Sequence, residues 1–116
     1  VSSFYKGGIT AYSNEAKSDI LGVPRELIEK HGAVSEEVAL AMARGARARF
    51  LSSCAIATTG VAGPDGGSDE KPVGLFFVAV AAPGKEEVHR FIFPFDRRGV
   101  MEFASHYGLY HLLKLL

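Results

Sequence analysis

Two runs typical of β-strands in the second half of the chain are separated by only three residues, and this spacing constrains the fold more than any other feature. The runs are GLFFVAVAA (74–82) and EEVHRFIFPF (86–95), with Pro83, Gly84 and Lys85 between them. A proline–glycine pair between stretches rich in β-branched and aromatic residues predicts a β-hairpin. Because a connection this short can join only antiparallel strands, it fixes one antiparallel pair of the sheet.

The rest of the chain alternates between segments typical of strands and of helices. GITAY (8–12) alternates apolar and polar residues as a strand does, and residues 54–59 have the composition of a buried strand. Helices are predicted between these two strands and again after the hairpin, each with a residue that favours a helix start. Those starting residues are Ser13 or Asn14, Pro24, Ser35 and, for a final helix to Leu116, Asp96.

The order of these elements places the chain in the α/β class. Helical connections between the first two strands favour parallel pairing, whereas the hairpin requires antiparallel pairing. The prediction is therefore a single layered α/β domain over residues 1–116, with a mixed sheet packed by helices. A chain of 116 residues that is 47% hydrophobic can bury a core of its own.

Charge and residue usage exclude several classes of partner. Lys and Arg number 13, and Asp and Glu also number 13, so no excess of positive charge indicates nucleic-acid binding. No apolar run approaches the ~20 residues of a transmembrane helix, so no membrane partner is expected. The single cysteine, Cys54, excludes an internal disulfide and is typical of a cytoplasmic protein. It lies in an apolar run, which favours a buried apolar role over a nucleophilic one.

The histidines do not indicate a metal site. His106 and His111 are five residues apart, which sets them about 140° apart around a helix. No acidic residue lies at ligand spacing from them. We therefore expect neither a metal nor a cofactor.

Two polar segments follow the first two predicted strands, at the sheet edge where α/β proteins usually bind ligands. One spans residues 12–17. The other spans residues 59–71 and holds several glycines, whose backbone N–H groups can approach an anion or an oxyanion closely. It is neither a Walker A loop nor a dinucleotide fingerprint, because GxxxxGK[ST] and GxGxxG are both absent from it. The alternative is a solvent-exposed loop whose glycines only make turns.

Lys17, in the first of these segments, also has two interpretations. A lysine on a short helix is usually a solvated charge. It can act as a general base only if burial or a nearby cation lowers its pKa toward neutrality.

Four blocks of the sequence resemble one known family in their order and spacing: GGITAYSNEAKSDILGV, HGAVSEEVALAMARGAR, TTGVAGPDGGSDEKPVG and FDRRGVMEFA. That family is the C-terminal domain of the competence/damage-inducible protein CinA, which also occurs as a stand-alone nicotinamide-nucleotide amidohydrolase. The resemblance covers nearly the whole chain. It implies hydrolysis of the carboxamide of nicotinamide mononucleotide to nicotinate mononucleotide and ammonia, a step of pyridine-nucleotide salvage that needs no cofactor.

The resemblance also implies roles for individual residues. The family uses a serine/lysine mechanism, in which serine attacks the amide carbon, lysine takes the serine proton and backbone N–H groups hold the oxyanion. By position the base is Lys17, with Tyr12 beside it to orient or bind. Lys71 and Arg97 are the candidates for the substrate phosphate, Arg97 because its planar fork suits phosphate. The full set expected against the substrate is Thr59, Gly60, Gly63, Asp65, Gly66, Gly67, Lys71 and Arg97.

The nucleophilic serine is the part of the family pattern that this sequence does not show. In the family it lies in an ESCTGG segment before the first matching block, and no such motif occurs in residues 1–116. We expect the serine upstream of Val1, so that the domain apparently lacks its N-terminal segment. Two other functions stay open: a catalytically silent nucleotide-binding module, and an oligomerisation domain that uses the apolar residues 108–116. A homo-oligomer is compatible with each of them.

Overall fold

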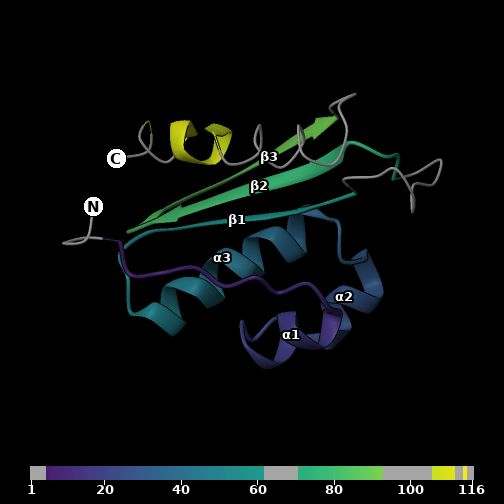
Figure 1. Cartoon of the computed structure of the whole chain (residues 1–116), viewed down its shortest axis with the longest axis horizontal. Coiled ribbons are helices and arrows are strands. Elements are labelled where there is room, and N and C mark those ends of the chain that lie inside the picture. The colour runs from purple at the N-terminus through teal and green to yellow at the C-terminus, as the bar shows by residue number, and fades with distance from the viewer. Residues whose placement is uncertain (1–4, 62–70, 93–105, 112–113, 115–116) are drawn as a thin grey trace.

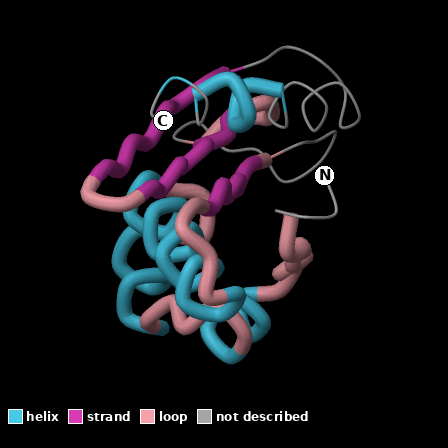
Figure 2. The backbone as a smooth tube through the Cα atoms, turned by 90° about the vertical axis from the view of Figure 1, so that its left-hand side faces the viewer, coloured by secondary structure: helices cyan, strands magenta, loops and turns pink. Residues whose placement is uncertain are grey.

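The computed structural model describes residues 5–61, 71–92, 106–111 and 114 of the chain. Residues 106–111 are helical and lie on the side of the sheet opposite α3 (Figure 1). A view turned by 90° shows the same layers, with the strands between α1–α3 on one side and the helical residues 106–111 on the other (Figure 2). The elements in chain order are α1 (Asn14–Asp19), α2 (Arg25–His31), α3 (Glu36–Phe50), β1 (Ala55–Gly60), β2 (Leu75–Ala82) and β3 (Lys85–Ile92).

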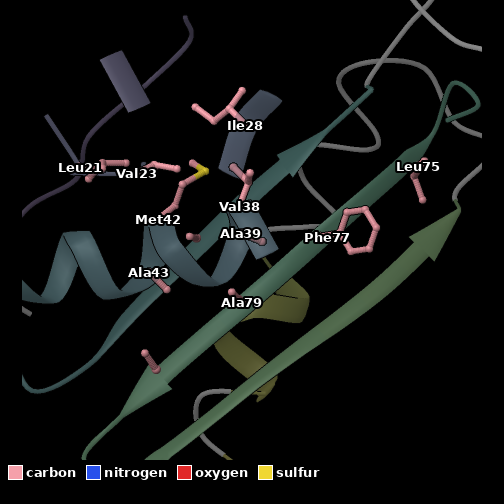
Figure 3. Close-up of a cluster of buried hydrophobic side chains, with 12 residues drawn as sticks. Leu21, Val23, Ile28, Val38, Ala39, Met42, Ala43, Leu75, Phe77 and Ala79 are labelled. Atoms are coloured by element: carbon pink, nitrogen blue, oxygen red, sulfur yellow. The ribbon is translucent and has the colours of Figure 1, made fainter. Parts of the chain in front are cut away.

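The central strand of the sheet, β2, is buried along its whole length. The strand order is β1-β2-β3, and β2 pairs antiparallel with both neighbours. Leu75, Phe77 and Ala79 point toward α3 and belong to the main hydrophobic cluster (Figure 3). Phe76 stacks instead on Phe91 of β3, with ring centroids 5.1 Å apart. Both faces of β2 are therefore covered, which explains why none of its side chains alternates toward solvent.

Helices α1 and α3 begin where their capping residues predict, whereas the predicted helix start at Asp96 lies outside the described residues. The Ser13 hydroxyl accepts a hydrogen bond from the Ala16 N–H at 3.0 Å, and the Ser35 hydroxyl accepts one from the Val38 N–H at 3.3 Å. Helix α2 begins at Arg25, with Pro24 at the capping position. Among the described residues, no helix has both the length and the apolar character needed to cross a membrane.

The predicted hairpin is confirmed, since Ala82 pairs with Lys85 across the turn. The predicted parallel pairing is wrong for the described strands: the sheet is antiparallel throughout. The prediction of parallel pairing depends on a strand at residues 8–12, but the structure forms no strand there. The helical connections that favoured parallel pairing therefore do not join two strands of this sheet.

The segment at residues 8–12 nevertheless alternates its burial as predicted. Ile9 and Ala11 turn inward and pack against the hydrophobic cluster, whereas Thr10 and Tyr12 face solvent. Next to this segment, Gly7 lies against the ring of Phe50 at the end of α3. The segment runs beside α3 in Figure 1. Its side-chain pattern is that of a strand, but its burial comes from helix packing.

Gly45 allows the chain between α1 and α2 to lie directly on α3. A Cβ at this position would overlap the backbone carbonyl of Leu21. Leu21 and Val23 belong to the cluster shown in Figure 3, together with Met42 of α3. A side chain at position 45 would push this segment away from α3 and open the cluster.

We predict that Gly45→Ala destabilises the fold by about 1–3 kcal/mol, because the overpacking outweighs the ~1 kcal/mol that alanine gains in helix propensity. Urea denaturation of both proteins measures the difference. The control is Arg49→Ala at an exposed position of the same helix, expected to change stability by less than about 0.5 kcal/mol. Equal stability of Gly45→Ala and the parent chain would contradict this packing.

Candidate functional site

Among the residues that the structure describes, Lys17 is the one charged residue that is buried. It lies in the last turn of α1, and 6% of the residue is exposed to solvent. Side chains of a helix lean toward its N-terminus, so the lysine reaches back to the residues that precede α1. There its Nζ donates to the backbone carbonyls of Ala11 at 3.1 Å and Tyr12 at 3.3 Å.

The surroundings of Lys17 disfavour its charged form. Burial lowers the pKa of the Lys17 ammonium below the ordinary lysine value. None of the ion pairs between described residues includes Lys17. Backbone carbonyls are partial charges and compensate an ammonium less than a carboxylate does. A lysine in this setting can supply a neutral amine, which is the form that a general base needs.

Tyr12 lies beside Lys17, as predicted, but through its backbone. Its carbonyl accepts the hydrogen bond from Lys17, while its residue is 80% exposed. The phenol therefore faces solvent rather than the ammonium.

Thr59 and Lys71 both bind the backbone around the C-terminal end of α2. The Thr59 hydroxyl donates to the Ala33 carbonyl at 2.7 Å, and the Lys71 Nζ donates to the His31 carbonyl at 2.7 Å. Thr59 comes from β1, whereas Lys71 precedes β2. The two residues thus tie both ends of the glycine-rich loop to one stretch of backbone.

Gly60 is the last residue of β1 and pairs with Phe76. A Cβ on Gly60 would come within 2.5 Å of the Phe76 Cβ, so the close approach of the two strands requires glycine here. The other predicted substrate residues, Gly63, Asp65, Gly66, Gly67 and Arg97, lie outside the described residues.

The described site residues form two groups, Lys17 with Tyr12 and Thr59 with Lys71. Lys71 also lines an open depression of about 400 Å³, together with His31 and Arg90. Glu36 and Glu37 of α3 line the same depression, so its charge is mixed. Sequence reasoning missed Arg90. Strand alternation was the available signal, because residues 86, 88 and 90 of β3 share one face.

A second cluster lies on the opposite face of the sheet, where the histidine spacing had indicated no metal ligands. The ligand atoms of Glu87, His89 and His111 all lie within 4.8 Å of one another. Burial, followed by the charge of His89, lowers the pKa of His111. The prediction of no metal site rested on the spacing of His106 and His111 within the last helix, and it did not consider residues of β3. Glu87 and His89 stand at the i, i+2 spacing of one strand face.

A comparison with known families assigns the chain. The model of the CinA C-terminal domain matches residues 1–116. The chain belongs to the CinA C-terminal domain family. The resemblance inferred from the four sequence blocks is confirmed.

Curated relatives from several bacteria carry this CinA domain within longer chains. The CinA-like protein of Leptospira biflexa is 45% identical over 116 residues, which cover 99% of this chain and 28% of that protein. The CinA-like protein of Geotalea daltonii is 54% identical over 99 residues, or 85% of this chain and 24% of that protein. The chain spans about a quarter of the length of these relatives.

Solved CinA structures share the fold. The competence damage-inducible protein A of Klebsiella pneumoniae superposes with a TM-score of 0.90 at 37% identity, over 96% of this chain and 69% of that one. A CinA superfamily protein of Escherichia coli gives a TM-score of 0.86 at 37% identity, over 91% of this chain and 62% of that one. These names state family membership and no reaction.

The hydrogen bond from Thr59 to the α2–α3 linker can be tested by an isosteric change. We predict that Thr59→Val lowers stability by about 1–3 kcal/mol, because the Ala33 carbonyl loses its buried donor. The matched control is Thr58→Val at the neighbouring exposed position, expected to stay within about 0.5 kcal/mol. Urea denaturation of the two variants decides, and equal effects would contradict a specific role for the Thr59 hydroxyl.

Proposed function

We propose that this CinA-family domain hydrolyses the carboxamide of nicotinamide mononucleotide, giving nicotinate mononucleotide and ammonia. The observation that carries the proposal is the environment of Lys17. Burying an ammonium that is held by two carbonyls costs folding free energy, and a functional role is a reason for a protein to keep such a residue. Lowered lysine pKa values are characteristic of catalytic bases, and the resemblance of the YSNEAK block to the family supports Lys17 as the base.

The proposed reaction uses Lys17 as the base and, as the nucleophile, a serine that we place upstream of Val1. Neutral Lys17 takes the proton of the serine hydroxyl while the serine oxygen attacks the carboxamide carbon. The tetrahedral intermediate then breaks its C–N bond, and the Lys17 ammonium gives the proton to the departing NH2 group, which leaves as ammonia. Water next attacks the resulting ester, giving its proton to Lys17, and the serine leaves with that proton. Lys17 begins and ends each cycle neutral, so it gains one proton and loses it again twice.

The remaining roles follow the anchoring of the glycine-rich loop. We assign the oxyanion contacts to backbone N–H groups of residues 60–67, which begin at the fixed end of β1. Lys71 is the proposed phosphate contact, together with Arg97. Arg90 is a further candidate because it lines the same depression as Lys71. Tyr12 is left with a backbone role toward Lys17, or with the substrate on its exposed side.

A silent nucleotide-binding domain is the second candidate, supported by the cationic side chains of Lys71 and Arg90 that line one depression. It differs from the first in one measurable respect. Such a domain binds the nucleotide but releases no ammonia, even when the upstream segment of the family is present.

The proposal is tested with a protein that carries that upstream segment. We predict that Lys17→Met lowers kcat/KM for nicotinamide mononucleotide by about 10²–10⁴-fold, which is the usual contribution of a general base to the rate. Ammonia release is the readout, and circular dichroism checks the fold. In the parent enzyme kcat/KM should rise with pH and level off below the ordinary lysine pKa, because burial lowers the pKa of Lys17.

The control for this test is Lys30→Met on α2, an exposed lysine, which should retain full turnover. Undiminished turnover in Lys17→Met would remove the base assignment. Binding without ammonia release in the parent protein would instead establish the silent module.

A further inference from the structure

The face of the sheet opposite α3 carries a cluster that the proposed hydrolysis does not use. Alternate residues of β3 point to opposite faces. Glu86 points toward α3, where Arg44 donates to its carboxylate at 2.7 and 2.8 Å. Glu87, His89 and Phe91 therefore face the helical segment 106–111, and the Phe91 ring lies 4.6 Å from that of Tyr107.

Three potential metal ligands meet on this face. The His89 Nε2 lies 3.0 Å from the Glu87 Oε2. The His111 ring stacks on the His89 ring, with centroids 3.7 Å apart and planes 15° apart. All three ligand atoms fall within 4.8 Å of one another. Residues from one strand and from a helix more than twenty positions later thus bring their polar ends to a single point.

We propose that Glu87, His89 and His111 bind a divalent transition-metal ion of the zinc type. Two imidazole nitrogens and one carboxylate oxygen are the donor set that Zn²⁺ accepts, whereas Mg²⁺ and Ca²⁺ prefer oxygen donors alone. Three protein ligands leave the fourth tetrahedral position to water. The ion fastens the helical segment 106–111 to β3.

The geometry needs one local adjustment. Donors on a tetrahedral zinc ion lie roughly 3.3 Å apart, given Zn–N and Zn–O lengths of about 2.0–2.2 Å. The pair of Glu87 and His89 already meets this spacing. Stacked rings direct their lone pairs nearly parallel, so the His111 ring must tilt out of the stack to converge on the same ion. This tilt is a side-chain rotation and requires no change of the sheet.

The cluster is also open to an ion and only partly opposed by nearby positive charge. The side chains of His89 and Glu87 are 31% and 42% exposed, so solvent reaches the donors. Lys114, three residues after this segment, is a nearby cation, and its Nζ lies 5.4 Å from the centre of the Tyr110 ring. That ring in turn meets His111 edge-on at 5.4 Å. The phenol therefore packs against both the ammonium and the imidazole.

Zinc binding by the whole chain, free of any affinity tag, tests the site. Isothermal titration calorimetry with Zn²⁺ should give one ion per chain, and Zn²⁺ in excess should raise the Tm by about 5 °C, reversed by a chelator. Mg²⁺ should do neither. Replacement by Co²⁺ should produce the visible absorption of a tetrahedral cobalt site, which a purely structural aromatic cluster cannot show.

Three variants assign the ligands. His89→Gln and His111→Gln should each weaken Zn²⁺ binding at least tenfold, whereas His106→Gln, an exposed histidine of the same segment, should bind as the parent does. Glu87→Gln, at an exposed position of β3, keeps the test valid if a histidine variant fails to fold, and it should also bind more weakly. No detectable Zn²⁺ binding by the parent chain in this titration overturns the proposal. Equal binding by the ligand variants and His106→Gln overturns it as well.

Discussion

The burial of β2 on both faces is the constraint from which the rest of the structure follows. A strand whose side chains are all buried cannot stand at the surface of a two-layer fold, so each face of the sheet must be covered. Helix α3 covers one face with Val38, Ala39 and Met42. Residues 106–111 cover the other, where Gly108 fits against Ile56 and Val78 without room for a side chain. One polar group lies on each side of the sheet. Lys17 lies on the side covered by α3, and the cluster of His89 and His111 lies on the side covered by residues 106–111.

The position of Lys17 depends on α3 through a chain of contacts. Gly45 admits the Leu21 backbone, and Leu21 with Val23 fixes the end of α1 against the core. The lysine one turn earlier is thereby held under the carbonyls of residues 11 and 12. Because burial lowers its pKa, the folded chain binds fewer protons than the unfolded chain between the lowered value and the ordinary one. Lys17 therefore reduces stability at neutral pH, and this cost disappears as the pH rises through that window.

Much of the fold could be predicted from the sequence because its signals are local. A short Pro–Gly turn determines the hairpin, and Ser13 and Ser35 cap their helices with their own hydroxyls. Strand pairing is not local. Residues 8–12 carry the alternation of a strand, yet helix packing accounts for their burial as well as sheet pairing would. Alternation reports which side is buried and not what covers it.

The candidate site was predictable only in part, for a related reason. The family resemblance singled out Lys17. The spacing of residues in the sequence does not indicate that Lys17 is buried or that two backbone carbonyls contact it. Thr59 and Lys71 were expected against the substrate, while the structure shows their bonds to the backbone around the C-terminal end of α2. The meeting of His89 with His111 depends on how the C-terminal helix packs on β3, which no periodicity within either element contains.

The central claim is that the fold holds Lys17 in surroundings that favour its neutral amine. The direct measurement is an NMR titration of the chain with ¹³C at the lysine Cε positions, using the Lys17→Met spectrum to assign the Lys17 resonance. The account predicts a Lys17 pKa below the ordinary lysine value of 10.5. A Lys17 resonance that titrates at or above that value would contradict it.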